Sequence, residues 1–217
     1  GRIAVPNRDG NETSFDHLFQ SGTYRGRLTI DGVDQVVDGW YGQRERSRGV
    51  RTMTGGQGLH IWYQAQFPDR SIGFILVETR DGARLLLEGA VMFVDGRLDG
   101  IVDVQHALVF DDSLDLKAGR VRVQTASGDT YVIDTDASAG GGFMAGAGYG
   151  GHHGRPMGPN HLEHDIYPLD GSVTPKTLDS SLTDRLAAFD WNGTRGYGIF
   201  EFALTRSSSY RYRPTLT

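Results

Sequence analysis

The feature that most constrains the fold is a series of tight-turn dipeptides that separate short runs of β-forming residues. Between such runs, the turn dipeptides include Asp-Gly at 31–32, 81–82, 95–96, 99–100 and 170–171, and Gly-Asp at 128–129. Such dipeptides between β-rich or alternating runs are typical of hairpins. The chain also contains 31 glycines and little helical periodicity. The pattern therefore predicts an all-β protein built from consecutive antiparallel strands.

The spacing of the turns predicts nine strands and implies a barrel or a sandwich. The expected strands cover residues 24–30, 35–46, 59–67, 72–79, 84–93, 98–110, 114–124, 130–136 and 197–205. One short helix is expected over 180–189, because Leu182, Leu186 and Phe189 lie at i, i+4 and i+7. Asp179 or Ser180 is its expected N-cap. Residues 137–170 form a long loop, whose first part is rich in Gly, Ala and His.

The run 59–67 separates two kinds of side chain by alternation. One face is apolar, and the other carries His60, Trp62, Gln64 and Gln66. In a closed barrel one face of each strand lines the lumen, and a polar and aromatic face suits a lumen that holds a mostly apolar ligand. The alternation leaves the alternative equally open that this face points to water.

The densest charged cluster is Arg44–Arg51, with four arginines, Glu45 and Ser47 in eight residues. On a strand, Arg44, Arg46 and Arg48 share one face, and Glu45 and Ser47 share the other. One interpretation is an ionised Glu45 that is held by arginines and orients water or a hydroxyl group. The other is a structural ion-pair network that closes one end of a barrel.

Composition excludes several classes of function. The chain has 217 residues, a formal net charge of −5 and no cysteine. Disulfides, thiolate catalysis, zinc–thiolate sites and iron–sulfur clusters are therefore excluded. The charge balance argues against nucleic acid as a partner, and no apolar run reaches the roughly 18 residues of a membrane helix. We expect a cytoplasmic protein without a membrane partner.

Motifs for cofactors and metals are also missing. Neither common phosphate-binding glycine loop is present, nor is the Gly-x-Ser-x-Gly elbow of serine hydrolases. Residues with metal-ligating side chains gather late in the long loop, at His152, His153, His161, Glu163, His164 and Asp165. Their spacing matches no known ligand motif, so we expect incidental histidines, no metal and no cofactor.

Three stretches resemble a bacterial family with paired lipocalin-like domains. The pattern Gly39-x-x-Gly42-Gln43-Arg44-Glu45-x-Ser47-x-Gly49-x-Arg51 resembles the family's Gly-x-Gly-Gln-Arg-Asp-His-Ser-Trp-Gly-x-Arg signature, with Glu45, Arg46 and Arg48 in place of Asp, His and Trp. Residues 15–22 and the strand 196–201 agree as well. The family is similar to the carotenoid hydratases (hydroxyneurosporene synthases). The resemblance covers nearly the whole chain and implies a lipocalin-like barrel, the C-terminal part of a two-domain protein.

The resemblance implies a function in binding a small hydrophobic organic molecule inside the barrel. If the domain is catalytic, cofactor-independent acid/base chemistry is expected: hydration, dehydration or isomerisation. The alternative is a non-catalytic ligand-binding or structural domain. Its other expected partner is a preceding lipocalin-like domain or another copy of the chain.

The predicted site residues follow from these arguments. Glu45 would be the acid/base, and more readily a base, since nearby arginines keep its charge. Arg44 and Arg51 would hold that charge or a substrate oxyanion, and Glu201 is the second carboxylate. The predicted ligand-binding residues are Tyr41, Arg46, Ser47, His60, Trp62 and Tyr197.

Overall fold

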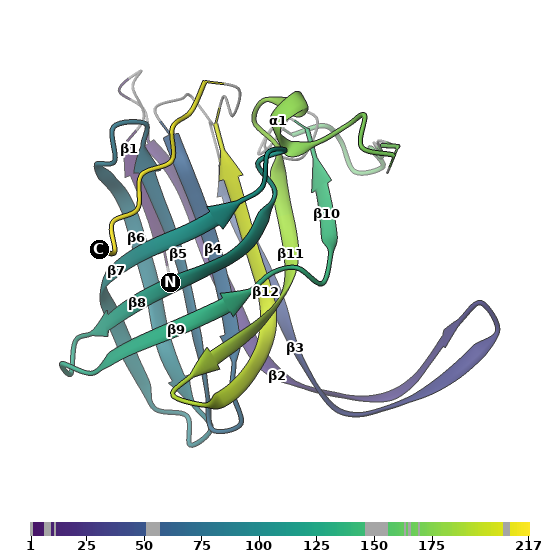
Figure 1. Ribbon diagram of the computed structural model, residues 1–217. Helices are drawn as coiled ribbons and strands as arrows, with labels where there is room; N and C mark the ends of the chain where they lie inside the picture. Colours follow the sequence, from purple (N-terminus) through teal and green to yellow (C-terminus); the bar gives the residue numbers. More distant parts are fainter. Residues whose placement is uncertain are drawn as a thin grey trace.

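The protein is all-β, and its main element is a closed barrel of eight antiparallel strands (Figure 1). The computed structural model describes residues 2–6, 10, 12–50, 57–145, 156–162, 164, 166–168, 170–205 and 209–217. The barrel order is β4-β5-β6-β7-β8-β9-β11-β12, and β12 returns to pair with β4. This arrangement confirms the predicted fold class. In the described part of the chain, no helix is long and apolar enough to cross a membrane.

The elements follow one another mainly as hairpins. The barrel strands are β4 (Gln57–Gln66), β5 (Arg70–Thr79), β6 (Arg84–Phe93), β7 (Leu98–Phe110), β8 (Leu116–Thr125), β9 (Thr130–Asp136), β11 (Leu182–Trp191) and β12 (Thr194–Leu204). The short strand β10 (Gly141–Met144) extends the edge of β11, and α1 (Pro175–Leu178) precedes β11. A separate sheet contains β1 (Arg2–Pro6), β2 (Glu12–Ile30) and β3 (Val33–Val50).

The nine predicted strands all occur, several with longer bounds. The Asp-Gly turn between β2 and β3 places Asp31 at φ 51° and Gly32 at φ 77°, the left-handed pair that a two-residue hairpin requires. The Asp-Gly at 99–100 is different, because it lies inside β7. There the Asp99 carboxylate accepts hydrogen bonds from the backbone N–H and the hydroxyl of Ser127, so it supports the neighbouring turn instead.

The predicted helix over 180–189 is wrong, because this segment is strand β11. Its apolar spacing also fits a strand, in which Thr183, Ala187 and Phe189 point into the core while Leu186 is exposed. Pairing with β9 and β12 closes the barrel and outweighs the local helical pattern. The only helix in the described residues ends at Asp179, a left-handed C-cap with φ 47°.

Side chains fill the inside of the barrel. The ring of Tyr63 stacks on Phe74 at 4.9 Å and meets the edges of Phe189 and Phe200 at 5.0 and 5.2 Å. These four side chains are fully buried. The lumen is therefore a packed core, like that of other small barrels.

The hairpin of β2 and β3 lies outside the barrel. Its first half covers the outer face of β4, where the Gln66 side chain donates a hydrogen bond to the carbonyl oxygen of Gly22 at 2.9 Å. Its second half, residues 24–40, continues as a two-stranded arm that extends away from the barrel (Figure 1). The hairpin thus divides into a part that covers the barrel wall and a part that projects from it.

Candidate functional site

The candidate site lies between the barrel wall and the hairpin that covers it. On the wall, cross-strand pairing places Asp184 on β11 beside Glu201 on β12, and Glu201 beside Trp62 on β4. Because paired residues of antiparallel strands point to the same side, these three side chains form one row on the outer face. The row brings two carboxyl groups and an indole together.

The wall supplies a histidine–carboxylate pair. His60 Nε2 lies 2.9 Å from Glu201 Oε1, and the two side chains are 19% and 14% exposed. His60 stands two residues before Trp62 on the same face of β4, which explains its reach to the neighbouring strand. A carboxylate so placed fixes the orientation of the imidazole ring.

The hairpin supplies a second pair. His17 Nε2 on β2 lies 2.8 Å from Glu45 Oε1 on β3, with side chains 8% and 37% exposed. The His17 ring packs between Phe15 and Phe19 and lies 6.0 Å from the ring of Trp62. The indole therefore joins the hairpin pair to the barrel pair.

Asp184 has the most distinctive electrostatics of the group. Partial burial, followed by the negative charges of Glu201 and Glu45, raises the pKa of Asp184 to about 6, while His60 opposes the rise. A hydrogen bond with Glu201 adds to the rise. Asp184 nevertheless keeps part of its surface in water at the edge of the cluster. A carboxyl group whose pKa is raised in this way, beside two other carboxyl groups, is a usual arrangement of an acid/base site.

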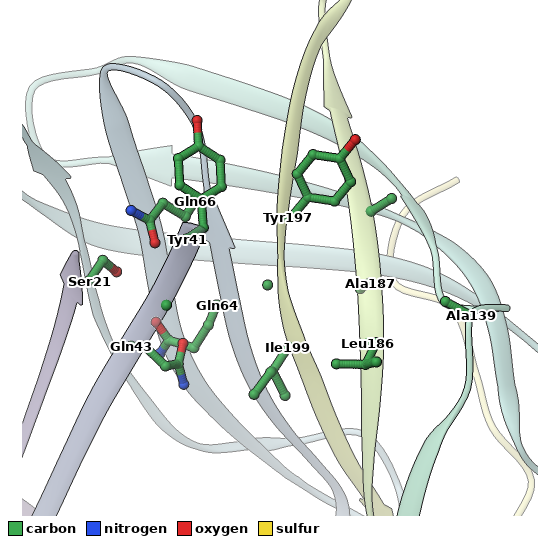
Figure 2. Close-up of a pocket in the computed structure, with 13 residues that line it drawn as sticks. Ser21, Tyr41, Gln43, Gln64, Gln66, Ala139, Leu186, Ala187, Tyr197 and Ile199 are labelled. Carbon is green, nitrogen blue, oxygen red and sulfur yellow. The ribbon is translucent and has the colours of Figure 1, made fainter. Parts of the chain in front are cut away.

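A cavity of about 390 Å³ adjoins this cluster on the outer face of the barrel. Tyr41 and Tyr197 lie side by side at one end, with ring centroids 6.5 Å apart (Figure 2). Leu186 and Ile199 form an apolar wall, and the polar side chains are those of Ser21, Gln43, Gln64 and Gln66. The volume and the mixed lining suit a small organic molecule.

A second cavity of about 320 Å³ lies on the other side of Phe19. His17, Trp62 and Glu88 line it. The indole N–H of Trp62 is buried and has no hydrogen-bond partner among the described residues. The acid/base cluster therefore has a cavity on each side.

The structure brings together several of the predicted site residues. Glu45, His60 and Glu201 belong to the cluster with Trp62, and Tyr41 and Tyr197 line the larger cavity. Ser47 pairs with His17 across the hairpin and is exposed. Their catalytic and ligand-binding roles remain predictions.

The arginines do not surround Glu45. Arg44 and Arg46 are exposed on the opposite face of β3, where they pair with Gln20 and Leu18 of β2. The strand alternation that separates them from Glu45 was predicted, but the partner of Glu45 is His17. Arg51 lies outside the described residues.

The two cavities described above lie outside the lumen, in which the sequence placed the ligand. The apolar face of β4 fills the lumen, and the face with His60 and Trp62 points outward. It does not meet open water either, because the hairpin covers it. The candidate binding cavity therefore lies outside the barrel.

His17, Asp184 and the environment of Gln64 were not recognised in the sequence. Strand alternation in 182–191 would have placed Asp184 opposite Glu201. Counting back from the turn at 31–32 would have placed His17 opposite residues 46 and 47 of the partner strand. These positions are close to Glu45. Both signals depend on strand segments that the sequence pattern did not predict, because the expected strand at 24–30 begins after His17 and 182–191 was expected to be helical.

The histidine-rich part of the long loop does not join this site. His161 and His164 are exposed, while His152, His153, Glu163 and Asp165 lie outside the described residues. Among the described residues, no group of three or more histidines and carboxylates is arranged to hold a metal ion.

Comparisons with known proteins define the class. Residues 4–154 match the family described as a domain of unknown function (DUF7064), and the chain belongs to this family. Among solved structures, the chain is similar in fold to kievitone hydratase from Nectria haematococca, with a TM-score of 0.50 and 10% sequence identity. The match covers 94% of this chain and 59% of the hydratase chain. The comparison with curated proteins gave no match.

Proposed function

We propose that the protein binds a small hydrophobic organic molecule beside the barrel and transforms it by cofactor-independent acid/base chemistry, with hydration as the favoured reaction. The observation that carries the proposal is the raised pKa of Asp184, about 6, in a cluster with two histidine–carboxylate pairs. The larger cavity adjoins this cluster. A fold shared with a hydratase is consistent with the proposal.

The roles divide according to charge. With a pKa of about 6, Asp184 keeps its proton to a higher pH than an ordinary aspartate and is the proposed acid. Glu45, in contact with His17, is the proposed base that accepts a proton from water. Glu201, oriented by His60, lies opposite Asp184 and is placed to return the proton to it. This assignment extends the sequence interpretation, which had a base in Glu45 but lacked an acid.

The second candidate is a non-catalytic ligand-binding domain. It is favoured by the exposure of Glu45 and by Arg46, which is exposed on the face of β3 that is opposite to Glu45. The carotenoid hydratases that the motif resembles have histidine at this position. Under this alternative the cavity holds a ligand, and the carboxyl groups only fix the hairpin to the barrel. A specific kinship with the carotenoid hydratases belongs to the first candidate and rests on the motif 39–51.

A labelled-water assay distinguishes the two candidates. Unsaturated hydrophobic compounds are incubated with the protein in oxygen-labelled water, and labelled alcohols are measured by mass spectrometry. Asp184→Asn and Glu45→Gln should each reduce the rate by a factor of about 100 or more, the usual contribution of an acid or base. Asp129→Asn, in the exposed β8–β9 turn, is the matched control. Product formation that is unchanged in both site variants would refute the acid/base proposal.

We also propose that the chain is part of a longer, two-domain protein. The hydratase chain extends well beyond the part that this chain matches. The projecting arm carries exposed apolar side chains, including Val33, Val36 and Trp40, which a preceding domain or another copy would cover.

A further inference from the structure

The larger of the two cavities lies next to the acid/base cluster. On each of four strands, a residue that lines the cavity is two positions from a residue of the cluster. On the barrel wall, Asp184 is followed by Leu186, Glu201 is preceded by Ile199, and Trp62 is followed by Gln64, each on the same outward face. On the hairpin, Gln43 precedes Glu45 in the same way. Two residues along a strand span about 6.5 Å, so a ligand in the cavity reaches the cluster with its far end.

Gln64 is the unusual side chain of this cavity. It is 3% exposed, and neither its amide nitrogen nor its amide oxygen has a hydrogen-bond partner among the described residues. A buried amide without partners costs about 1–3 kcal/mol, so a ligand group that hydrogen-bonds to it would recover part of that cost. Gln64 lines the cavity in Figure 2 on the same side as Gln43.

The neighbouring strand provides room for this amide. Gly73 on β5 pairs with Gln64, and a Cβ atom there would lie 2.7 Å from the Gln64 oxygen and 2.5 Å from the Phe19 ring. Any larger residue would push the amide or the phenyl ring aside. A glycine inside a central strand weakens it, so its presence fits a position that must admit another group closely.

The rest of the cavity indicates a flat, apolar ligand. Tyr41 and Tyr197 present two aromatic rings at one end, and Leu186 and Ile199 present aliphatic groups along the wall. None of the cavity-lining side chains is a lysine, an arginine or a carboxylate. The lining therefore complements an uncharged ring system with one polar group near Gln64.

From this geometry we propose that the cavity binds an α,β-unsaturated ketone carried on an aromatic ring, with its carbonyl oxygen accepting a hydrogen bond from the Gln64 amide and its double bond directed toward the acid/base cluster. This inference rests on the proposed function for its chemical step but not for its binding step. It assigns the substrate class and makes Gln64 the specificity-determining residue.

The chemical step balances with the groups present. Glu45 removes a proton from water as the oxygen forms a bond to the β-carbon, and the π electrons of the double bond move onto the carbonyl oxygen. The Gln64 N–H stabilises the resulting enolate. Asp184 then protonates the α-carbon, which restores the carbonyl and gives a β-hydroxy ketone. The proton on Glu45 returns to Asp184, so water is the only co-reactant.

A pair of probes tests the binding step. Chalcone has two aromatic rings joined by a conjugated ketone, and trans-stilbene has the two rings joined by the double bond alone. Ligand-detected NMR titrations should show that the protein binds chalcone about fivefold more tightly than stilbene, as expected for one buried hydrogen bond. In Gln64→Leu the affinities for chalcone and stilbene should become about equal, because leucine keeps the side-chain volume and removes the hydrogen-bond donor. Gln124→Leu, exposed on β8, should keep the wild-type preference.

The outcomes separate this inference from the proposed function. A ketone preference that depends on Gln64 supports the inference whether or not hydration follows, and hydration is then judged by Asp184→Asn alone. Equal binding of the two probes, a preference that survives Gln64→Leu, or no binding of either probe overturns it. The Gln64→Leu variant should melt no lower than the wild type, because it removes an unpaired buried amide.

Discussion

At the scale of single residues, the candidate site depends on carboxyl groups in unlike surroundings. Glu201 and Glu45 each contact a histidine, whereas Asp184 lies between two negative charges in partial burial. In the proposed mechanism these different surroundings separate a proton donor from proton acceptors. The same difference couples the ionisation of Asp184 to folding.

We expect Asp184→Asn to stabilise the protein above pH 6. The pKa of Asp184 rises from 3.8 to about 6 on folding, so the folded state binds the proton more tightly and wild-type stability falls as pH rises through that window. Because Asp184 remains partly in water, screening reduces the cost to about 1 kcal/mol, or about 2–4 °C in melting temperature at pH 8.

Thermal melts of both proteins from pH 4 to pH 8 check this sign. The gap between variant and wild type should widen with pH and vanish near pH 4. A variant that melts lower than the wild type at pH 8 would show that the charged form of Asp184 is the stabilising one.

The residues of the site were only partly predictable from sequence. Glu45, His60 and Glu201 stood out, because ionisable side chains on recognisable strands can be assigned to a face. His17 and Asp184 did not, because His17 lies before the first expected strand and Asp184 lies in the segment expected to be a helix. Arg44 and Arg46 were overvalued, since closeness in sequence to Glu45 places them on the opposite face of the strand.

At the scale of elements, the C-terminal segment 209–217 supports the splayed part of the barrel. β6 and β7 pair over only three residues, and the segment packs alongside β7 beyond that point. The Tyr212 hydroxyl lies 2.8 Å from His106 Nδ1 and accepts a hydrogen bond from the Leu108 N–H at 2.8 Å. His106 Nε2 in turn lies 3.3 Å from buried Glu78, so one hydroxyl completes a polar network inside the barrel.

We expect Tyr212→Phe to lower the free energy of unfolding by about 1–3 kcal/mol, because it leaves the Leu108 N–H and His106 without this partner. Burial raises the pKa of Tyr212, so the hydroxyl keeps its proton and the loss should not depend on pH up to 9. Urea denaturation measures the change. Tyr24→Phe, exposed on the arm, should shift it by less than about 0.5 kcal/mol. Equal effects of the two variants would exclude a structural role for the network.

Strands were predicted correctly where the residues of a tight turn define a hairpin. The prediction failed at β11, where closure of the barrel determines the secondary structure. Asp-Gly turns fix hairpins from four residues, so β5 to β9 could be read directly. β11 has an apolar spacing that suits either a helix or a strand, and only its two neighbours in the closed barrel select the strand.

At the scale of the whole molecule, the barrel and the arm contribute differently to the free energy of unfolding. The barrel has a continuous core, whereas the arm is a two-stranded ribbon with Leu28, Ile30 and Val33 exposed. Isolated two-stranded ribbons are marginal in water, so the arm adds little to the fold.

Replacing residues 25–38 with an Asn-Gly turn should leave the barrel intact. The new turn would join Tyr24 to Gly39, beyond the Gly22 contact with Gln66. The melting temperature should change by less than about 2 °C, since the removed side chains are mostly exposed. Circular dichroism and calorimetry measure both properties. Loss of cooperative melting would mean that the arm is part of the barrel's folding unit.

The two histidine–carboxylate pairs of the site form at different stages of folding. His17 and Glu45 are 28 residues apart and meet within one hairpin, whereas His60 and Glu201 are 141 residues apart and meet only when β12 joins β4. Local hairpins form far sooner than such distant pairings. The hairpin contact can therefore form before the barrel closes, and packing on the barrel wall then stabilises it. Any chemistry of this site would therefore require that β12 is paired with β4, so a chain without β12 would be inactive.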